Sequence, residues 1–118
     1  MTFDQFHAPH VDVVGDLHKL SSYFKEGEFD TVICTEVFEH TQEFWIAMKE
    51  IEKVLRPGGL FVGTAPFAHE LHGEEYGDYW RIAPQGWEFL LKDFVNVEIK
   101  TRGVWPQINH VAARGIKK

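Results

Sequence analysis

The sequence contains a single cysteine, and no two of its glycines are separated by just one residue. One cysteine cannot form an internal disulfide. Because Cys34 lies in an apolar run, we expect a buried thiol in a reducing compartment rather than a catalytic nucleophile. The missing Gly-x-Gly spacing excludes the usual glycine-rich loop that binds a nucleotide cofactor. The sequence therefore lacks two of the commonest local signatures of an enzyme active site.

Basic stripes, long apolar runs and leader signals are missing as well. The formal net charge is -6 with both signs interspersed, which argues against nucleic acid as a partner. No apolar run approaches the roughly 18 residues that a membrane-spanning helix needs. The first residues are neither basic nor apolar enough for a signal peptide. We expect one cytoplasmic domain over residues 1–118, with no membrane contact.

The pattern of apolar residues predicts a βαβ unit. Residues 29–35 and 60–65 are nearly continuous in apolar and β-branched side chains, which is typical of strands buried on both faces. Between them, residues 41–55 carry an amphipathic helical pattern, with Thr41 as the expected N-cap. Pro57–Gly59 should end this helix in a tight turn. We expect residues 11–14, 29–34 and 60–63 to form parallel strands of one sheet.

The C-terminal half predicts a long loop, a short helix and a hairpin. Residues 66–84 are irregular and rich in His, Glu, Tyr and Trp, and a loop of this length usually has a function. Pro84 suits the first position of a helix that continues over residues 85–93. Strands over 94–100 and 109–116 should pair antiparallel. The predicted fold is α/β, a mostly parallel Rossmann-like sheet with an antiparallel C-terminal hairpin.

Four segments in order resemble the class I S-adenosylmethionine-dependent methyltransferases of the methyltransferase 11 type. They are VDVVGD (11–16), FDTVIC (29–34), EVFEH (36–40) and EIEKVLRPGG (50–59). The resemblance implies that S-adenosylmethionine is the cofactor and that no catalytic triad is needed, because the transferred methyl group is already activated. It also implies that the family's first strand and glycine loop come before everything in this sequence, so the chain resembles a domain truncated at its N-terminus.

The resemblance assigns cofactor roles near the ends of three strands. Asp4 would bind the ribose hydroxyls, Asp16 the adenine amino group, and Leu17 an apolar wall of the adenine. Thr35 and Glu36 would lie under the methyl-transfer position. The residues alone allow other roles. Asp16 could equally cap a turn, Leu17 could be an ordinary core residue, and the Glu36 carboxylate could simply interact with the positive N-terminal end of a helix dipole.

The long loop resembles the substrate-side loop of methyltransferases in bacterial glycan biosynthesis, through PFAHELHG (66–73) and DYWRIAP (78–84). We expect His40, His69 and His72 as candidate general bases, and Tyr79, Trp80 and Arg81 as substrate-binding residues. The alternatives are a locally packed His40 and a loop held down by its own aromatic side chains. A metal site at His69 and His72 is disfavoured because no third ligand follows at a regular spacing.

Two functions remain open from the sequence. The first is a methyltransferase acting on a small-molecule, glycan-related acceptor, incomplete or weakly active as this chain. The second is a non-catalytic remnant that serves as an interaction or assembly protein. The missing first strand would leave the edge of the strand at 29–34 unpaired. The remaining strands could close over the gap, a second copy could pair there, or a separate polypeptide could supply the missing unit; we favour the first two and expect a homodimer.

Overall fold

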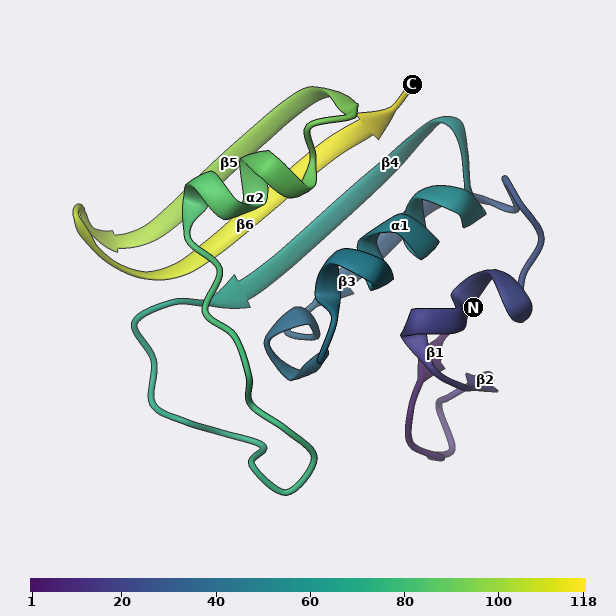
Figure 1. Cartoon of the computed structure of the whole chain (residues 1–118), viewed down its shortest axis with the longest axis horizontal. Coiled ribbons are helices and arrows are strands. Elements are labelled where there is room, and N and C mark those ends of the chain that lie inside the picture. The colour runs from purple at the N-terminus through teal and green to yellow at the C-terminus, as the bar shows by residue number, and fades with distance from the viewer.

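A computed structural model describes residues 1–118, which form a small and a larger sheet (Figure 1). In the small sheet, β1 (Phe3–Asp4) pairs in parallel with β2 (Val13–Val14). The larger sheet has the order β3-β4-β6-β5. Its strands are β3 (Phe29–Thr35), β4 (Leu55–Pro66), β5 (Phe94–Val104) and β6 (Gln107–Lys117). The helical segments are η1 (Leu17–Ser22), η2 (Phe38–His40), α1 (Phe44–Val54) and α2 (Pro84–Leu90).

The βαβ prediction is confirmed for β3, α1 and β4. Residues 31–35 of β3 pair in parallel with residues 60–64 of β4, and α1 forms the crossover between them. The apolar face of α1 is buried, as the amphipathic pattern requires (Ala47, Met48, Ile51, Val54). The predicted turn takes the form of a bulge in which Gly58 adopts a positive φ of 79°, a conformation that glycine reaches without strain.

The C-terminal hairpin is also confirmed. β6 pairs antiparallel with β5 on one side and with β4 on the other, so β5 forms the far edge. Pro84 opens α2 as expected, although the helix ends at Leu90 rather than Asp93. The fold is therefore the expected α/β arrangement, with parallel strands at one side of the sheet and an antiparallel hairpin at the other.

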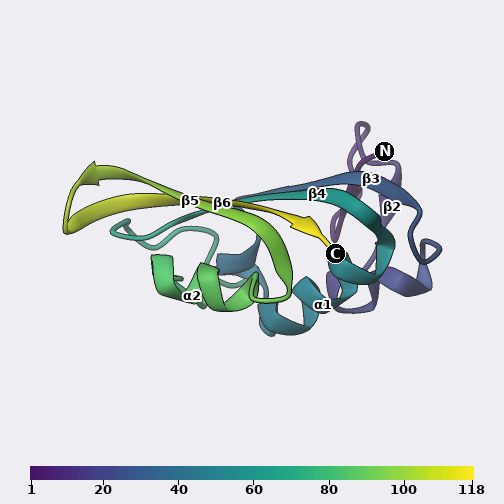
Figure 2. The same cartoon turned by 90° about the horizontal axis from the view of Figure 1, so that it is seen from above.

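Both α-helices lie on the same face of the larger sheet, as the view from above shows (Figure 2). The core fills the space between them and the sheet. Phe38 lies at its centre, stacked on Trp87 and Phe61 with ring centroids 5.6 and 6.3 Å apart. All three side chains are fully buried. This aromatic stack joins η2, α2 and β4, and it fixes η2 beneath the carboxyl end of β3.

Two local predictions were wrong. Residues 11–14 do not join the larger sheet, because β2 contains only Val13 and Val14 and its single neighbour is β1. Thr41 does not cap α1. Its hydroxyl instead donates to the carbonyl of Val37, and the residue ends η2. Glu43 occupies the N-cap position, and its backbone N–H donates to the His18 ring.

The outer edge of β3 is open. β4 pairs with one side of this strand, and no strand pairs with the other side. The Ile33 side chain is 69% exposed, which is unusual for a large aliphatic residue in a strand. The remaining strands therefore do not close over the gap, and one of the outcomes that the sequence left open is excluded. No helix is long and apolar enough to span a membrane.

Candidate cofactor and acceptor site

A cavity of about 1180 Å³ separates the two sheets. It exceeds the roughly 300–1,000 Å³ of ordinary ligand pockets. Its walls come from β1, η1, the open side of β3 and the long loop, and they include 14 hydrophobic residues among 27. Parallel α/β sheets bind ligands beyond the carboxyl ends of their strands, and the ends of β1 and β3 border this cavity.

Asp16 lies on the cavity wall as the N-cap of η1. Its carboxylate accepts the backbone N–H of His18 at 2.9 Å and the His18 ring Nδ1–H at 2.7 Å. The backbone hydrogen bond from His18, followed by that of the ring, lowers the pKa of Asp16 below its usual range. The capping role is thus present in the structure, and the half-exposed carboxylate keeps free acceptor positions toward the cavity.

His18 links this aspartate to the start of α1. Its Nδ1 donates to Asp16, while its Nε2 accepts the backbone N–H of Glu43 at 3.1 Å. The ring therefore holds the neutral tautomer that is protonated on Nδ1. The sequence pattern around His18 contains no motif that assigns it a role. Its bridging role was missed because Glu43 is 25 residues away, and no local pattern connects the two.

Asp4 and Leu17 also line the cavity, on the same side as Asp16. The Asp4 carboxylate accepts the backbone N–H of Phe6 at 3.1 Å and is otherwise exposed at the end of β1. Leu17 is half-buried and packs against the core. The structure therefore brings together the three residues assigned to the adenosine part of the cofactor.

Thr35 and Glu36 follow β3 but differ in position. Thr35 is exposed and does not border the cavity. Glu36 does border it and has a positive φ of 55°, which is uncommon for a residue with a side chain. The Glu36 carboxylate pairs with Nε2 of His110 on β6 at 2.5 Å. Of this predicted pair, only Glu36 lies at the cavity.

His40, at the end of η2, lies against His72 from the long loop, with ring centroids 4.7 Å apart. Nδ1 of His40 donates to the carbonyl of Gly77 at 2.6 Å. His40 and His72 line the cavity, as does His69, whose ring is 5.1 Å from that of His72. The three predicted histidines therefore gather at one wall, although His69 is exposed and its ring contacts the Glu70 carbonyl.

Glu39 lies next to His40 but behind this wall, because its side chain does not border the cavity, and no site role was predicted for it from the sequence. Its side chain is completely buried, and neither carboxylate oxygen has a hydrogen-bond partner. Burial raises the pKa of Glu39 to about 7. Buried carboxylates are rarely unpartnered. The only sequence signal was its position beside His40, since a glutamate between Phe38 and His40 on so short a segment gives no indication of burial.

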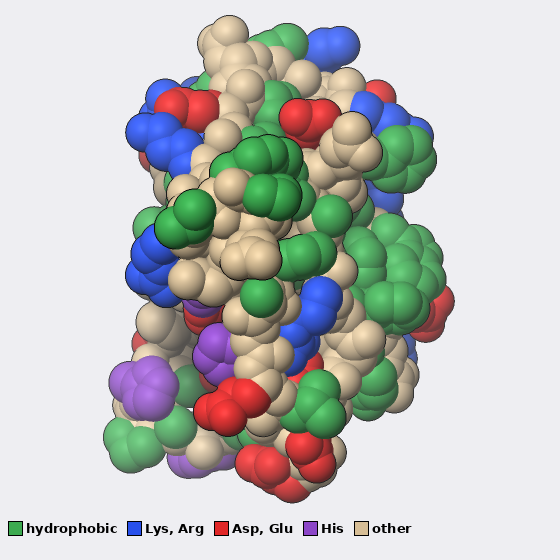
Figure 3. All heavy atoms as spheres, turned by 90° about the vertical axis from the view of Figure 1, so that its left-hand side faces the viewer, with side chains coloured by type: hydrophobic (Ala, Val, Ile, Leu, Met, Phe, Trp, Pro, Cys, Tyr) green, Lys and Arg blue, Asp and Glu red, His purple; other side chains and the backbone are tan.

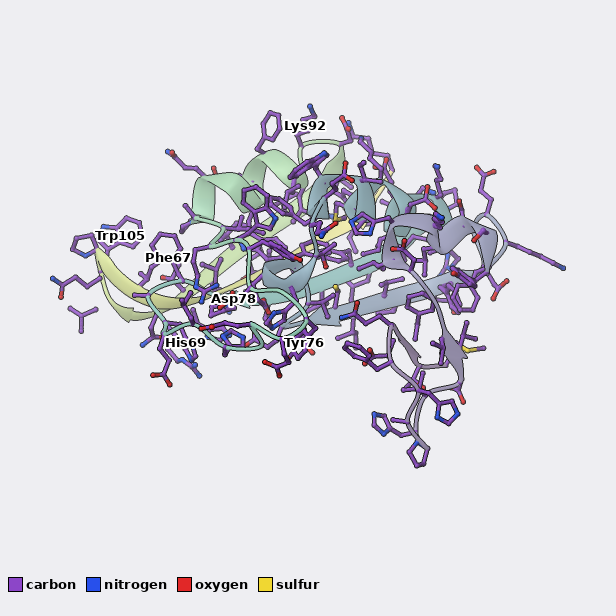
Figure 4. The ribbon with its side chains drawn as sticks, turned by 60° about the horizontal axis from the view of Figure 1, so that its bottom comes forward. Phe67, His69, Tyr76, Asp78, Lys92 and Trp105 are labelled. Carbon is purple, nitrogen blue, oxygen red and sulfur yellow. The ribbon has the colours of Figure 1, made fainter.

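The long loop is held by one buried ion pair. Arg81 donates to both carboxylate oxygens of Asp78, at 2.7 and 3.1 Å, and the backbone N–H of His72 donates to the same carboxylate at 2.8 Å. Figure 4 shows Asp78 within this loop, near His69 and Tyr76. The hydrogen bonds from Arg81 lower the pKa of Asp78 well below its usual range. Asp78 therefore fixes the backbone that carries His72.

Tyr79, Trp80 and Arg81 do not border the cavity. The backbone N–H of Tyr79 donates to the carbonyl of Glu39 at 2.7 Å, and Nε1 of Trp80 donates to the carbonyl of Gln42 at 3.0 Å. Trp80 also packs edge-on against Phe44 of α1, 5.5 Å between centroids. These contacts fasten the loop to η2 and α1, and substrate binding by the three residues stays a prediction.

Cys34 is buried at the end of β3, where burial raises the pKa of its thiol to about 12. A thiol with this pKa has no thiolate near neutral pH, so it does not act as a nucleophile. The cysteine behaves as the small buried hydrophobe that the sequence predicted.

Comparisons with known proteins agree with this geometry. A family model described as a methyltransferase domain matches residues 3–63. The ubiquinone biosynthesis O-methyltransferase of Xanthomonas euvesicatoria is 37% identical over 75 residues, which cover 58% of this chain and 30% of that protein. This chain thus spans less than a third of that relative.

Solved structures resemble the fold over almost the whole chain. A 1,6-didemethyltoxoflavin-N1-methyltransferase from Burkholderia thailandensis, solved with S-adenosylhomocysteine, has a TM-score of 0.75 at 15% identity. The match covers 98% of this chain and 60% of that one. A methyltransferase from Archaeoglobus fulgidus has a TM-score of 0.73 at 12% identity, covering 96% and 71%. At these identities the likeness concerns the fold. Together with the family match over residues 3–63, it places this chain in the methyltransferase domain family of class I, whose cofactor is S-adenosylmethionine.

Proposed function

We propose that this chain takes part in S-adenosylmethionine-dependent methyl transfer to a small-molecule acceptor. The observation that carries the proposal is the cavity, which has carboxylates on its β1–η1 side and histidines on its loop side. The two sides suit the two substrates of a methyl transfer, with the adenosine of the donor at one end and the acceptor at the other.

The β1–η1 side fits the adenosine part of the cofactor. Asp4 and Asp16 offer carboxylate oxygens to ribose hydroxyls and to an adenine amino group, and Leu17 offers an apolar wall. The cofactor supplies the activated methyl group, and these residues would bind and orient it. The sequence has no Gly-x-Gly loop to donate backbone N–H groups to the cofactor carboxylate. Charge-assisted hydrogen bonds of that kind contribute about 1.5–3 kcal/mol each, so we expect weak binding by this chain alone.

Calorimetric titration with S-adenosylhomocysteine tests this assignment. We expect weak binding that Asp16→Ala weakens further and that Asp93→Ala, a change at an exposed aspartate outside the cavity, leaves alone. Low-micromolar binding by the unmodified chain would contradict the expected weakness. An unchanged affinity in Asp16→Ala would remove this residue from the site. Absence of any binding would favour the alternative of a non-catalytic interaction protein.

For the acceptor we propose a hydroxyl group. The relative from Xanthomonas euvesicatoria is by its name an O-methyltransferase. His40, His69 and His72 all line the loop side of the cavity, which supports them as candidates for accepting a hydroxyl proton. A glycan-related acceptor is the second candidate, carried by the resemblance of the loop sequence. Transfer of a labelled methyl group to parallel panels of phenols and sugars distinguishes the two acceptors, with His72→Gln expected to slow transfer to either.

We further propose a cytoplasmic homodimer in which a second copy pairs with the open edge of β3. The exposed Ile33 and the unpaired side of this strand support the proposal. Light scattering at micromolar concentration tests it, with Ile33→Lys expected to shift a dimer toward monomer. A monomer at all concentrations would contradict the dimer without affecting the proposed chemistry, and cell fractionation would check the location.

A further inference from the structure

Behind the cavity wall formed by η2 and the long loop lies a buried carboxylate with no hydrogen-bond partner. Glu39 is 0% exposed, and both of its carboxylate oxygens lack a hydrogen bond. The permanently charged Arg81 does not pair with it and donates to Asp78 instead. A buried carboxylate without a counter-charge is costly, so this arrangement calls for a cation that the side chains of the protein do not supply.

Two imidazole rings adjoin this carboxylate. His40 follows Glu39 directly, and its Nε2 lies 3.9 Å from Oε1 of Glu39. His72 comes from the long loop, with its ring nearly perpendicular to that of His40. One potential ligand atom from each of Glu39, His40 and His72 lies within 4.8 Å of the other two. A single ion about 2.0–2.2 Å from each ligand could therefore be reached by all three after small side-chain adjustments.

The hydrogen bonds around the two histidines suit metal coordination. Nδ1 of His40 donates to the carbonyl of Gly77, which leaves the lone pair of Nε2 free on the side of Glu39. This is the arrangement by which proteins orient a metal-binding histidine, with the second ring nitrogen tied to a carbonyl. The backbone of His72 is in turn fixed by its N–H donation to Asp78. The His40 ring and the His72 backbone are therefore held by contacts that do not use the Glu39 carboxylate.

We propose that Glu39, His40 and His72 bind one divalent transition-metal ion such as Zn²⁺. Two imidazoles and one carboxylate form a set of borderline and hard ligands that suits zinc and its first-row neighbours better than Ca²⁺ or Mg²⁺. Because both histidines line the cavity, a further coordination position would open toward it. The inference extends beyond the proposed methyl transfer, and its test does not need the cofactor. With the ion bound, His40 and His72 would be ligands, and His69 would be the histidine left to accept a hydroxyl proton.

The site does not follow from sequence spacing. The candidate pair noted in the sequence was His69 and His72, but the structure gives His72 a different set of partners. His40 and His72 are separated by a long loop that folds back onto η2, as the backbone hydrogen bond from Tyr79 to Glu39 shows. In Figure 3, histidine and acidic side chains gather in the lower part of the face shown.

The test uses the full chain, treated with a chelator and then desalted. Calorimetric titration with Zn²⁺ should show one equivalent bound. Co²⁺ in its place should give the visible absorption bands that are typical of this ion at a low coordination number. Glu39→Gln and His72→Ala should each lower the Zn²⁺ affinity by at least about tenfold, since even changes to partners of metal ligands cost that much. Zn²⁺ should also raise the melting temperature of the unmodified chain more than that of either variant.

His10→Ala provides the matched control, because this exposed histidine lies outside the cluster. Its Zn²⁺ affinity should equal that of the unmodified chain. Circular dichroism establishes that each variant is folded, and Glu39→Gln keeps the volume of the side chain if His72→Ala disturbs the loop. Failure to bind one equivalent of Zn²⁺ or Co²⁺ would overturn the proposal. So would equal losses in His10→Ala and His72→Ala, which would indicate scattered binding to surface histidines.

Discussion

Replacing Asp78 by Asn should loosen the long loop, because the Asp78 carboxylate joins its two arms through His72 and Arg81. The Asp78 side chain is 1% exposed and accepts three hydrogen bonds, two from Arg81 and one from the backbone of His72. Asparagine keeps the size of the side chain and one acceptor oxygen, but it removes the negative charge and one of the two acceptors. The guanidinium of Arg81 then remains partly buried without a counter-charge.

The expected cost is about 2–3 kcal/mol of unfolding free energy. Hydrogen bonds to charged groups contribute about 1.5–3 kcal/mol each, and breaking a fully buried ion pair costs about 3–5 kcal/mol. The Arg81 side chain is 22% exposed, so water can replace part of the hydrogen bonding that its guanidinium loses. We therefore expect a cost near the lower end for a buried ion pair. Urea unfolding followed by tryptophan fluorescence is a suitable assay, since Trp80 packs where the loop meets α1.

The control is Asp93→Asn, which removes an ion pair of different character. Asp93 contacts Lys49 at 3.1 Å, but both side chains are more than half exposed, and such pairs contribute about 0–1 kcal/mol. The difference between Asp78→Asn and the unmodified chain should also depend on pH. Because the folded-state pKa of Asp78 is lowered by Arg81, its contribution is present above the unfolded pKa near 3.9 and is lost as pH falls further. Equal costs for the two variants at pH 7 would refute the reasoning.

Three further outcomes follow from other buried groups. In metal-free protein, the raised pKa of Glu39, about 7, means that its contribution is present below the unfolded value of 4.5 and is lost as pH rises toward 7. In Glu39→Gln, this pH-dependent loss of unfolding free energy should disappear, as measured by urea unfolding. If the variant keeps the pH dependence of the unmodified chain, the burial of Glu39 is contradicted. Cys34 should react with a thiol reagent only after urea unfolds the chain, since burial raises its pKa to about 12, and fast labelling of the folded protein would disprove this. Phe38→Ala should cost about 3–5 kcal/mol, because it removes the centre of the aromatic stack, and a loss under 1 kcal/mol would show that the stack contributes little.

The elements predicted most accurately were those specified by local pattern. The apolar runs at β3 and β4 and the amphipathic stripe of α1 each carry their own period, so their type and their parallel pairing could be inferred without the structure. Pro84 likewise marked the start of α2. Helix starts without a side-chain cap were harder. The helix α1 begins at Phe44 because the His18 ring accepts the N–H of Glu43, and this contact joins residues far apart in sequence.

Burial explains most of what the sequence could not predict. β5 has the expected alternation in sequence, but Val95 and Val97 are both 38% exposed, at a point where a bulge disturbs the pairing with β6. At the candidate site, the sequence indicated the histidines, whose chemistry is recognisable by residue type. The burial of the Glu39 carboxylate without a hydrogen-bond partner depends on where the long loop folds. From the sequence alone, this carboxylate could not be distinguished from one on the surface.

The position of β4 determines which parts of this domain can fluctuate independently. This strand hydrogen-bonds to β3 on one side and to β6 on the other, over residues 60–64 and 60–66 respectively. Each amide of β4 bonds to one of these neighbours, so an opening that exposes all of them must separate both, which amounts to global unfolding. Amides on the outer edge of β3 can exchange after a local opening that leaves the C-terminal hairpin intact. Hydrogen exchange should therefore be slowest in β4 and several orders of magnitude faster at the border of the cavity, so the cavity wall can move while the sheet behind it stays assembled.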